Sequence, residues 1–126
     1  MENFLARIRC KREGLRLWRH RMDQATLEIA LLDVRPGQEA AFEAAFAEAR
    51  RFISSASGYL DHELQRCVEK PNRYLLLVRW RSLKDHTSGF RDSASYQEWR
   101  KLLHHFYDPF PEVLHFHDTG LGASRG

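Results

Sequence analysis

The spacing of hydrophobic positions changes several times along the chain, and each change predicts a new element. Residues 26–34 (TLEIALLDV) have a period of two, which predicts a strand. One face of this strand carries Leu27, Ile29 and Leu31. The other face carries Glu28, Ala30 and Leu32. An RPG break follows, and its Pro36 suits a first helical turn. Residues 38–53 then repeat Ala and Phe at helical spacing, which predicts an amphipathic helix.

The second half of the chain starts with two more strands. Residues 59–68 alternate, which places Leu60, His62, Leu64 and Val68 opposite Tyr59, Asp61, Glu63 and Gln65. A Lys-Pro-Asn sequence at residues 70–72 is typical of a hairpin turn. Residues 74–81 form the next predicted strand, and its run YLLLV is apolar on both faces. Both faces of this strand must therefore be covered.

Two helical segments and a last strand complete the pattern. Residues 82–90 start with Ser82 as a helix cap, and residues 93–106 carry aromatic and leucine side chains at helical spacing. Residues 112–118 predict a final strand. The order β-α-β-β-α-β predicts a ferredoxin-like α+β fold, an antiparallel sheet with both helices on one face.

Such a sheet has a second face that the helices do not cover. In this chain the second face includes apolar residues of the 74–81 strand. Removing apolar surface from water stabilises by about 25 cal/mol per Å². We therefore expect a homodimer in which the sheets of two copies pack together.

Composition and charge limit the classes of function. The chain has 126 residues, enough for one domain, and no apolar run of membrane-spanning length, so no membrane partner is expected. Its two cysteines form no motif, which favours a reduced, cytoplasmic protein. Residues 1–22 hold seven Lys or Arg and two Glu, a charge of +5, whereas the remainder holds 13 basic and 15 acidic residues. The positive charge therefore belongs to an extension, and we expect no nucleic-acid partner for the folded body.

The predicted organisation has three parts. Residues 1–25 are a basic N-terminal extension, expected to be disordered or partly helical. Residues 26–119 are the folded domain, and residues 120–126 are a flexible Gly/Ser tail.

Several features together resemble the antibiotic biosynthesis monooxygenase (ABM) domain. They are the element order, the strand that ends in Trp80, the Ser82-Leu83-x-x-His86 helix start and the closing strand at residues 111–115. The segment from His86 to Leu103 is similar to one branch of small bacterial members. The resemblance covers about residues 26–119. It implies a dimeric α+β barrel with a pocket between sheet and helices in each subunit.

The resemblance also implies a chemistry, oxidation of a phenol- or quinol-like aromatic by O₂ without flavin, haem or metal. Triplet O₂ reacts slowly with closed-shell molecules unless the substrate is ionised, so the site must supply a base and an apolar pocket. His86 is the predicted catalytic base and Trp80 a catalytic donor. The predicted substrate-binding residues are Tyr74, Phe90, Arg91, Tyr96, Trp99 and His115.

Each of these residues also has a structural interpretation. Trp80 and Trp99 suit core packing, His86 a helix surface, and Arg91 an ion pair. The alternative function is therefore a non-catalytic or isomerising protein that binds a small molecule on the same dimer.

Metal and haem chemistry find less support in the sequence. His115 and His117 share a strand face, but no acid or cysteine motif completes a ligand set, so no metal is expected. Haem-degrading relatives of the fold use an Asn on the first strand, and residues 26–34 contain none.

Overall fold

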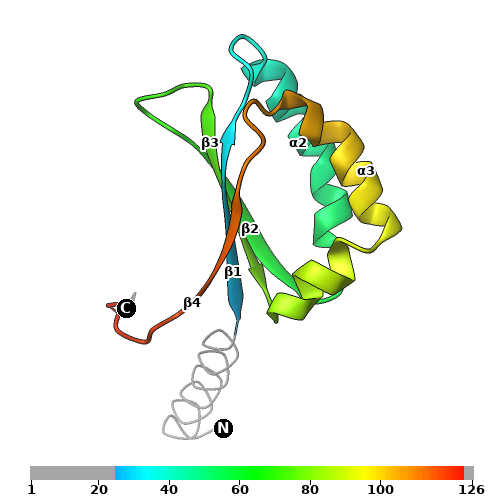
Figure 1. The fold of residues 1–126 in the computed structure, drawn as a ribbon, viewed down its shortest axis with the longest axis vertical. Coiled ribbons are helices and arrows are strands. Elements are labelled where there is room, and N and C mark those ends of the chain that lie inside the picture. Colours follow the sequence, from blue (N-terminus) through cyan, green and yellow to red (C-terminus); the bar gives the residue numbers. More distant parts are fainter. Residues whose placement is uncertain (1–24, 124–126) are drawn as a thin grey trace, which may run out of the picture.

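The structure, a computed structural model, describes residues 25–123 and consists of one sheet and two packed helices (Figure 1). The strands are β1 (Thr26–Asp33), β2 (Tyr59–Arg66), β3 (Arg73–Trp80) and β4 (Val113–His117), in the order β2-β3-β1-β4. The helices are α2 (Glu39–Ser54) and α3 (Ala94–Leu103), with a π-helical turn η1 (Asp85–Phe90) before α3 and a 3₁₀ turn η2 (His104–Phe106) after it. All strand pairs are antiparallel. The predicted ferredoxin-like α+β fold is confirmed.

Strand β1 is an inner strand of the sheet and pairs with both β3 and β4. Glu28 lies between Val78 of β3 and His115 of β4, on the face toward the helices. Ala30 and Leu32 follow on that face and are buried. The period of two thus brings one acidic side chain into an otherwise apolar surface.

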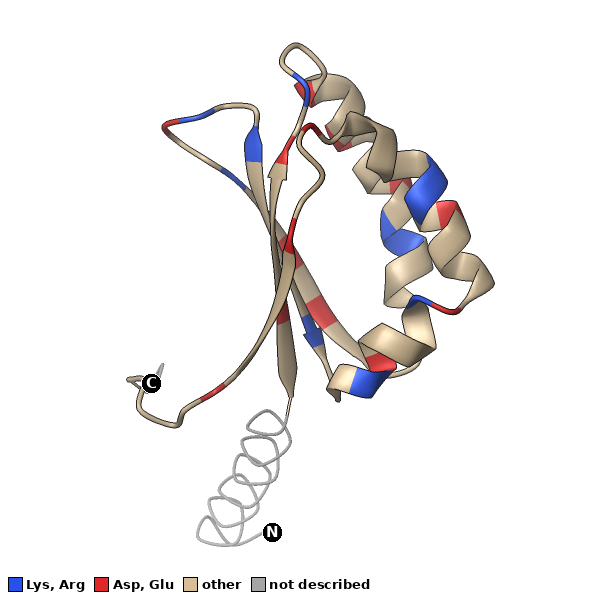
Figure 2. Cartoon of the chain, viewed as in Figure 1, with Lys and Arg blue, Asp and Glu red and all other residues tan. Residues whose placement is uncertain are grey.

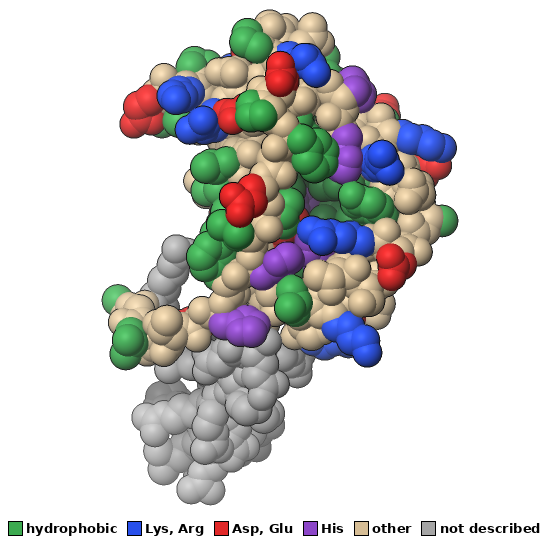
Figure 3. Space-filling view, viewed as in Figure 1, with side chains coloured by type: hydrophobic (Ala, Val, Ile, Leu, Met, Phe, Trp, Pro, Cys, Tyr) green, Lys and Arg blue, Asp and Glu red, His purple; other side chains and the backbone are tan. Residues whose placement is uncertain are grey.

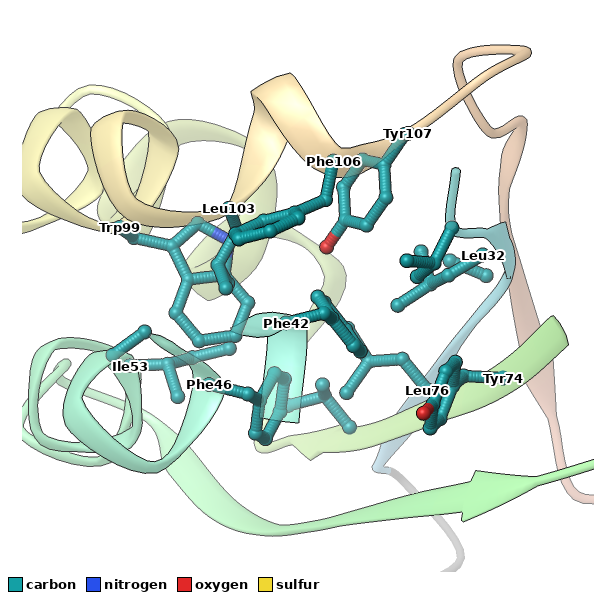
Figure 4. Close-up of a cluster of buried hydrophobic side chains, with 14 of the residues drawn as sticks. Leu32, Phe42, Phe46, Ile53, Tyr74, Leu76, Trp99, Leu103, Phe106 and Tyr107 are labelled. Carbon is teal, nitrogen blue, oxygen red and sulfur yellow. The ribbon is translucent and has the colours of Figure 1, made fainter. Parts of the chain in front are cut away.

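The core lies between the sheet and the helices (Figure 4). Phe42 and Phe46 of α2 pack against Tyr74 and Trp99, with ring centroids 4.9 and 5.6 Å apart. Phe42 is fully buried. A buried side chain of this size stabilises the fold by roughly 1.5–3 kcal/mol through its removal from water. The apolar stripe predicted for residues 38–53 is therefore the packing face of α2.

The other face of the sheet has no helix over it in the described residues (Figure 1). The outer face carries Leu27, Ile29, Leu31, Leu75, Leu77, Leu114 and Phe116. Leu31, Leu114 and Phe116 are about half exposed. Charged residues of both signs lie on the helices, the loops and parts of the strands (Figure 2). On the outer face they include Arg79, Asp61 and Glu63 at the β2 side of the sheet. The outer face is thus the large apolar surface that the homodimer prediction requires.

One assignment of faces was wrong. A bulge between Tyr59 and Asp61 shifts the alternation of faces by one residue at the start of β2. Tyr59 therefore lies on the inner face with His62, whereas Asp61 lies on the outer face. Val68 lies beyond the end of β2 and is 90% exposed. A bulge adds one residue to a strand and reverses the alternation at that point.

Three predictions concern the ends of the chain and the membrane. The extension over residues 1–25 lies outside the described residues except for Ala25, and residues 124–126 of the tail lie outside them as well. Within residues 25–123, no helix is long and apolar enough to cross a membrane.

Candidate functional site

A cavity of about 420 Å³ lies between the sheet and the helices, within the size range of small-molecule sites. A hollow bordered by apolar, histidine and basic side chains is visible on this face of the molecule (Figure 3). The lining residues come from every part of the domain: Glu28, Ala30, Leu32, Ile53, Leu76, His86, Phe90, Arg91, Tyr96, Trp99, His104, Tyr107, Phe110, Pro111 and Val113. Most of these residues are apolar or aromatic, and Glu28, His86, Arg91 and His104 add polar groups to the wall.

The main polar feature of the cavity is a hydrogen-bonded chain that starts at Glu28. The indole N–H of Trp80 donates to Glu28 Oε1 over 2.9 Å, and His86 Nε2 lies 3.2 Å from the same oxygen. His86 Nδ1 is 2.8 Å from Nε2 of His115. The His86 ring is stacked on Trp80, with centroids 5.1 Å apart and an interplanar angle of 15°. Both histidines and the carboxylate are thereby held in fixed orientations.

The turn η1 places His86 and Phe90 toward the interior. Before it, the backbone N–H of Asp85 bonds to Ser82 Oγ, and the Ser82 hydroxyl donates to the Asp85 carboxylate over 2.9 Å. The N–H of Arg91 then reaches back five residues to the carbonyl of His86. This wider turn leaves His86 and Phe90 both buried. Such π turns are frequent at functional sites.

Burial and nearby charge shift the pKa values of the buried pair in opposite directions. Burial raises the pKa of Glu28, and the Trp80 hydrogen bond and the charge of Arg91 only partly oppose this. Burial lowers the pKa of His86 to about 3, with Arg91 and His115 adding to the effect. His86 is therefore neutral near pH 7. The contact of His86 with Glu28 is therefore the approach of a neutral ring to a carboxyl oxygen, with Nε2 3.2 Å from Oε1 and within reach of it as a donor, rather than an ion pair.

Arg91 supplies positive charge at the polar end of the cavity. It lines the cavity and forms no ion pair within residues 25–123. Its charge acts on Glu28, His86 and His115. An unpaired guanidinium beside a cavity can hold an anionic oxygen of a ligand.

Aromatic rings form the other end of the cavity. His104 lies 5.0 Å from Phe110 and 5.9 Å from Tyr96, measured between ring centroids. Tyr107 lies 6.0 Å from His104, and its hydroxyl points toward the interior (Figure 4). Phe110 is 63% exposed, so this end is the rim. The cavity thus has a polar inner end and an aromatic rim.

The predicted site residues fall into two groups. His86, Phe90, Arg91, Tyr96 and Trp99 are brought together on the cavity wall. The remaining three do not line the cavity, although two of them belong to the polar chain.

Of these three, His115 contacts His86 from β4, and Trp80 is fully buried and donates to Glu28. Tyr74 lies elsewhere, and its hydroxyl donates to Glu43 over 2.7 Å. Burial and this contact raise the pKa of Tyr74 to about 12. The structure therefore gives Tyr74 a packing role and places Trp80 behind the carboxylate.

Among the lining residues with polar side chains, sequence reasoning missed three, Glu28, His104 and Tyr107. The available signal for Glu28 was its position, because it alternates with Ala30 and Leu32 on one strand face. No comparable signal marked Tyr107, which follows the last helical turn. Within the described residues, no group of three or more His, Cys, Asp or Glu side chains could hold a metal ion.

Comparison with known proteins identifies the family to which this chain belongs. Residues 26–104 match the sequence profile of the family described as antibiotic biosynthesis monooxygenase. The chain belongs to this family.

Two relatives support the assignment at the level of sequence. The uncharacterized protein YczJ of Bacillus subtilis (strain 168) is 53% identical over 92 residues, which are 73% of this chain and 97% of YczJ. A solved structure from Bordetella bronchiseptica, assigned to the antibiotic biosynthesis monooxygenases, is 41% identical in sequence and has a TM-score of 0.73. The match covers 76% of this chain and 98% of the Bordetella chain.

A third comparison shows the fold alone. SnoaB of Streptomyces nogalater, described as a cofactor-independent oxygenase, was solved as a point mutant. It is 18% identical with a TM-score of 0.63, and the match covers 82% of this chain and 99% of SnoaB.

Proposed function

We propose that the protein is a cofactor-independent monooxygenase that oxidises a small phenol-, quinol- or polyketide-like aromatic with O₂. Family membership and the described activity of SnoaB support this kind of chemistry. The observation that carries the proposal is the Glu28–His86 pair beside Arg91 at the inner end of an aromatic cavity. A planar ring can lie among the aromatic walls with its acidic oxygen toward Arg91.

Glu28 is the proton acceptor in this proposal, and His86 orients it. A base works best when its pKa lies near the working pH, and burial moves the pKa of Glu28 upward in that direction. His86, with a pKa of about 3, holds a proton weakly but keeps its N–H on the carboxylate. The role predicted for His86 therefore passes to Glu28, and Trp80 becomes a positioning residue.

The proposed reaction inserts one oxygen atom and releases the other as water. Glu28 removes a proton from the substrate, and Arg91 holds the resulting enolate or phenolate oxygen. The anion passes one electron to O₂, and the radical pair joins to form a C–O bond. The peroxide takes a proton back from Glu28. The oxidised carbon then loses its remaining hydrogen as a proton while the O–O bond breaks, and the departing hydroxide takes a proton to leave as water, so a carbonyl group remains. The apolar walls keep the radical pair away from water.

We propose in addition that the protein works as a homodimer. The apolar outer face of the sheet supports this, because Leu31, Leu114 and Phe116 would otherwise remain in contact with water. The inner face and its cavity lie on the opposite side of the sheet, so dimerisation leaves the polar chain in place.

One observation favours the alternative, an isomerising binder. The Glu28–His86 pair can take a proton from one carbon and return it to another without O₂, and the hydroxyl of Tyr107 lies on the same cavity. The two functions differ in their need for oxygen.

The experiment follows O₂ consumption with anthrone and with a panel of hydroquinones, corrected for autoxidation. We expect faster consumption by wild type and a loss of roughly 10²–10⁴-fold in Glu28→Gln, the usual contribution of a positioned base. Glu48→Gln, at an exposed position of α2, is the matched control and keeps full rate. No acceleration of any compound would refute the oxygenase. Proton exchange or isomerisation of the same compounds under nitrogen, without oxygen uptake, would establish the alternative.

A further inference from the structure

We propose that His86 and His115 form a proton relay that connects Glu28 in the cavity to solvent. The proposal rests on the role of Glu28 as proton acceptor in the proposed function, although the relay itself requires no oxygen. It assigns His115, a residue outside the cavity wall, to the exchange of protons between a ligand-filled site and the surrounding water.

The geometry provides an unbroken path. Glu28 Oε1 lies 3.2 Å from His86 Nε2, and the opposite ring nitrogen, Nδ1, lies 2.8 Å from His115 Nε2. Each imidazole therefore presents one nitrogen to each neighbour. Both distances are within hydrogen-bond range.

The path ends at the surface. His115 lies on β4, which is an edge strand of the sheet formed by the described residues, and its side chain is half-buried. Its Nδ1 makes no hydrogen bond within residues 25–123, yet this part of the chain holds no buried side-chain nitrogen or oxygen without a partner. The Nδ1 atom is therefore accessible to water. Because His115 lies on the inner face, opposite Leu114 and Phe116, the proposed dimer contact does not use it.

The relay works through a change of tautomer in both rings. With Glu28 ionised, His86 donates from Nε2 to the carboxylate and accepts at Nδ1 from His115. When Nδ1 of His115 takes a proton from water, its Nε2 proton passes to Nδ1 of His86, and the Nε2 proton of His86 passes to Glu28. The carboxyl group is then neutral, and both histidines are neutral in the other tautomer. The reverse sequence returns the proton to water.

This route suits the charges around it. A relay by tautomer change never leaves His86 as an imidazolium, the form that burial and the charge of Arg91 disfavour. The other groups near the carboxylate cannot replace it: Trp80 is only a donor, and Arg91 keeps its proton. Burial, with a smaller contribution from the charge of Glu28, raises the pKa of the Tyr107 hydroxyl, which keeps it protonated.

A bound aromatic makes the relay necessary. The cavity is the direct route for water to Glu28, and a ligand that fills it closes that route. The two histidines then remain as the polar connection from Glu28 to solvent within the described residues. Glu28 stays in equilibrium with the surrounding pH only through them.

The first experiment needs no turnover, because anthrone held under nitrogen fills the cavity and closes the direct route for water. NMR of protein labelled with ¹⁵N-histidine measures the exchange of the His86 ring N–H with water. We expect exchange to slow at least tenfold in His115→Gln, whose amide still bonds His86 but cannot switch tautomers. His117→Gln is the matched control, because His117 lies two residues along β4 and contacts Thr26 instead. Its exchange rate should equal that of wild type. Unchanged exchange in His115→Gln would overturn the relay.

The second experiment measures turnover with anthrone as the probe. His115→Gln should lower kcat at least tenfold with little change in KM, and added imidazole should restore the rate by carrying protons to His86. A rate that falls without imidazole rescue contradicts the relay and points to altered packing. If exchange slows in His115→Gln but no variant oxidises anthrone or any hydroquinone, the proposed oxygenase fails while the relay stands.

Discussion

Replacing Glu28 tests whether this buried carboxylate serves chemistry or stability. In Glu28→Gln the amide oxygen can take the place of Oε1 and accept from both Trp80 and His86. The variant loses the extra strength of two bonds to a charged acceptor, about 1 kcal/mol each, and no longer buries a charge. Each unit by which burial raises the pKa of Glu28 costs about 1.4 kcal/mol at neutral pH. We expect Glu28→Gln to equal or exceed wild type in stability near pH 7.

A second variant gives the opposite result. Glu28→Leu fills a similar volume but leaves the buried N–H groups of Trp80 and His86 without their acceptor. Each orphaned donor costs about 1–3 kcal/mol, so the free energy of unfolding should fall by roughly 2–6 kcal/mol. Comparison of the two variants separates the hydrogen-bonding role of the side chain from its charge.

The pH dependence of the free energy of unfolding shows whether the neutral or the ionised form of Glu28 stabilises the fold. The folded pKa of Glu28 lies above its ordinary value of 4.5, so the folded state holds more protons than the unfolded state between the two values. The contribution of Glu28 to stability is complete below pH 4.5 and is lost as the pH rises through the folded pKa. The advantage of Glu28→Gln over wild type should therefore grow upward from about pH 4.5 and then become constant.

Urea denaturation of both proteins from pH 4.5 to 8, at one protein concentration, measures this difference. The reasoning fails if Glu28→Gln is several kcal/mol less stable than wild type at pH 7 and the gap narrows toward acid. That outcome would mean that the ionised carboxylate stabilises the fold and holds its charge tightly, as a poor proton acceptor would.

Three further changes test other parts of the structure. Trp80→Phe removes a donor to the buried carboxylate and some packing, so it should lower stability by about 2–4 kcal/mol in denaturation and move the acid limb of oxygen consumption to higher pH. If the proposed dimer forms through the outer face, Phe116→Asp should give a folded monomer in light scattering where wild type gives a dimer, and a persistent dimer would place the interface elsewhere. Gly58→Ala should cost more than Gly37→Ala by thermal denaturation, because both have a positive φ but only the first new Cβ would overlap Asp85.

The order and bounds of the elements were predictable because local periodicity determines them. The strand predicted at residues 26–34 is observed at Thr26–Asp33, and the helix predicted at residues 38–53 is observed at Glu39–Ser54. Tyr59 was assigned to the wrong face because a bulge is a property of the pairing between two strands, which one strand alone does not show.

The site was only partly predictable for the same reason. Phe90, Arg91, Tyr96 and Trp99 are close in the chain, so one helical region brings them together. Glu28 is distant in sequence from all of them, and only the register of β1 against β3 and β4 reveals its position. The sequence also makes the face of Leu27, Ile29 and Leu31 the more apolar, although the helices cover the opposite face.

Strand β1 places neighbouring residues in two unrelated environments. Glu28, Ala30 and Leu32 line the cavity, whereas Leu27, Ile29 and Leu31, which alternate with them, lie on the outer face. Insertion or deletion of one residue within this strand would exchange the two sets of side chains. It would place the carboxylate on the apolar outer face and an isoleucine beside the two histidines. Evolution can therefore adjust either property by substitution at alternate positions, but not by changing the length of the strand.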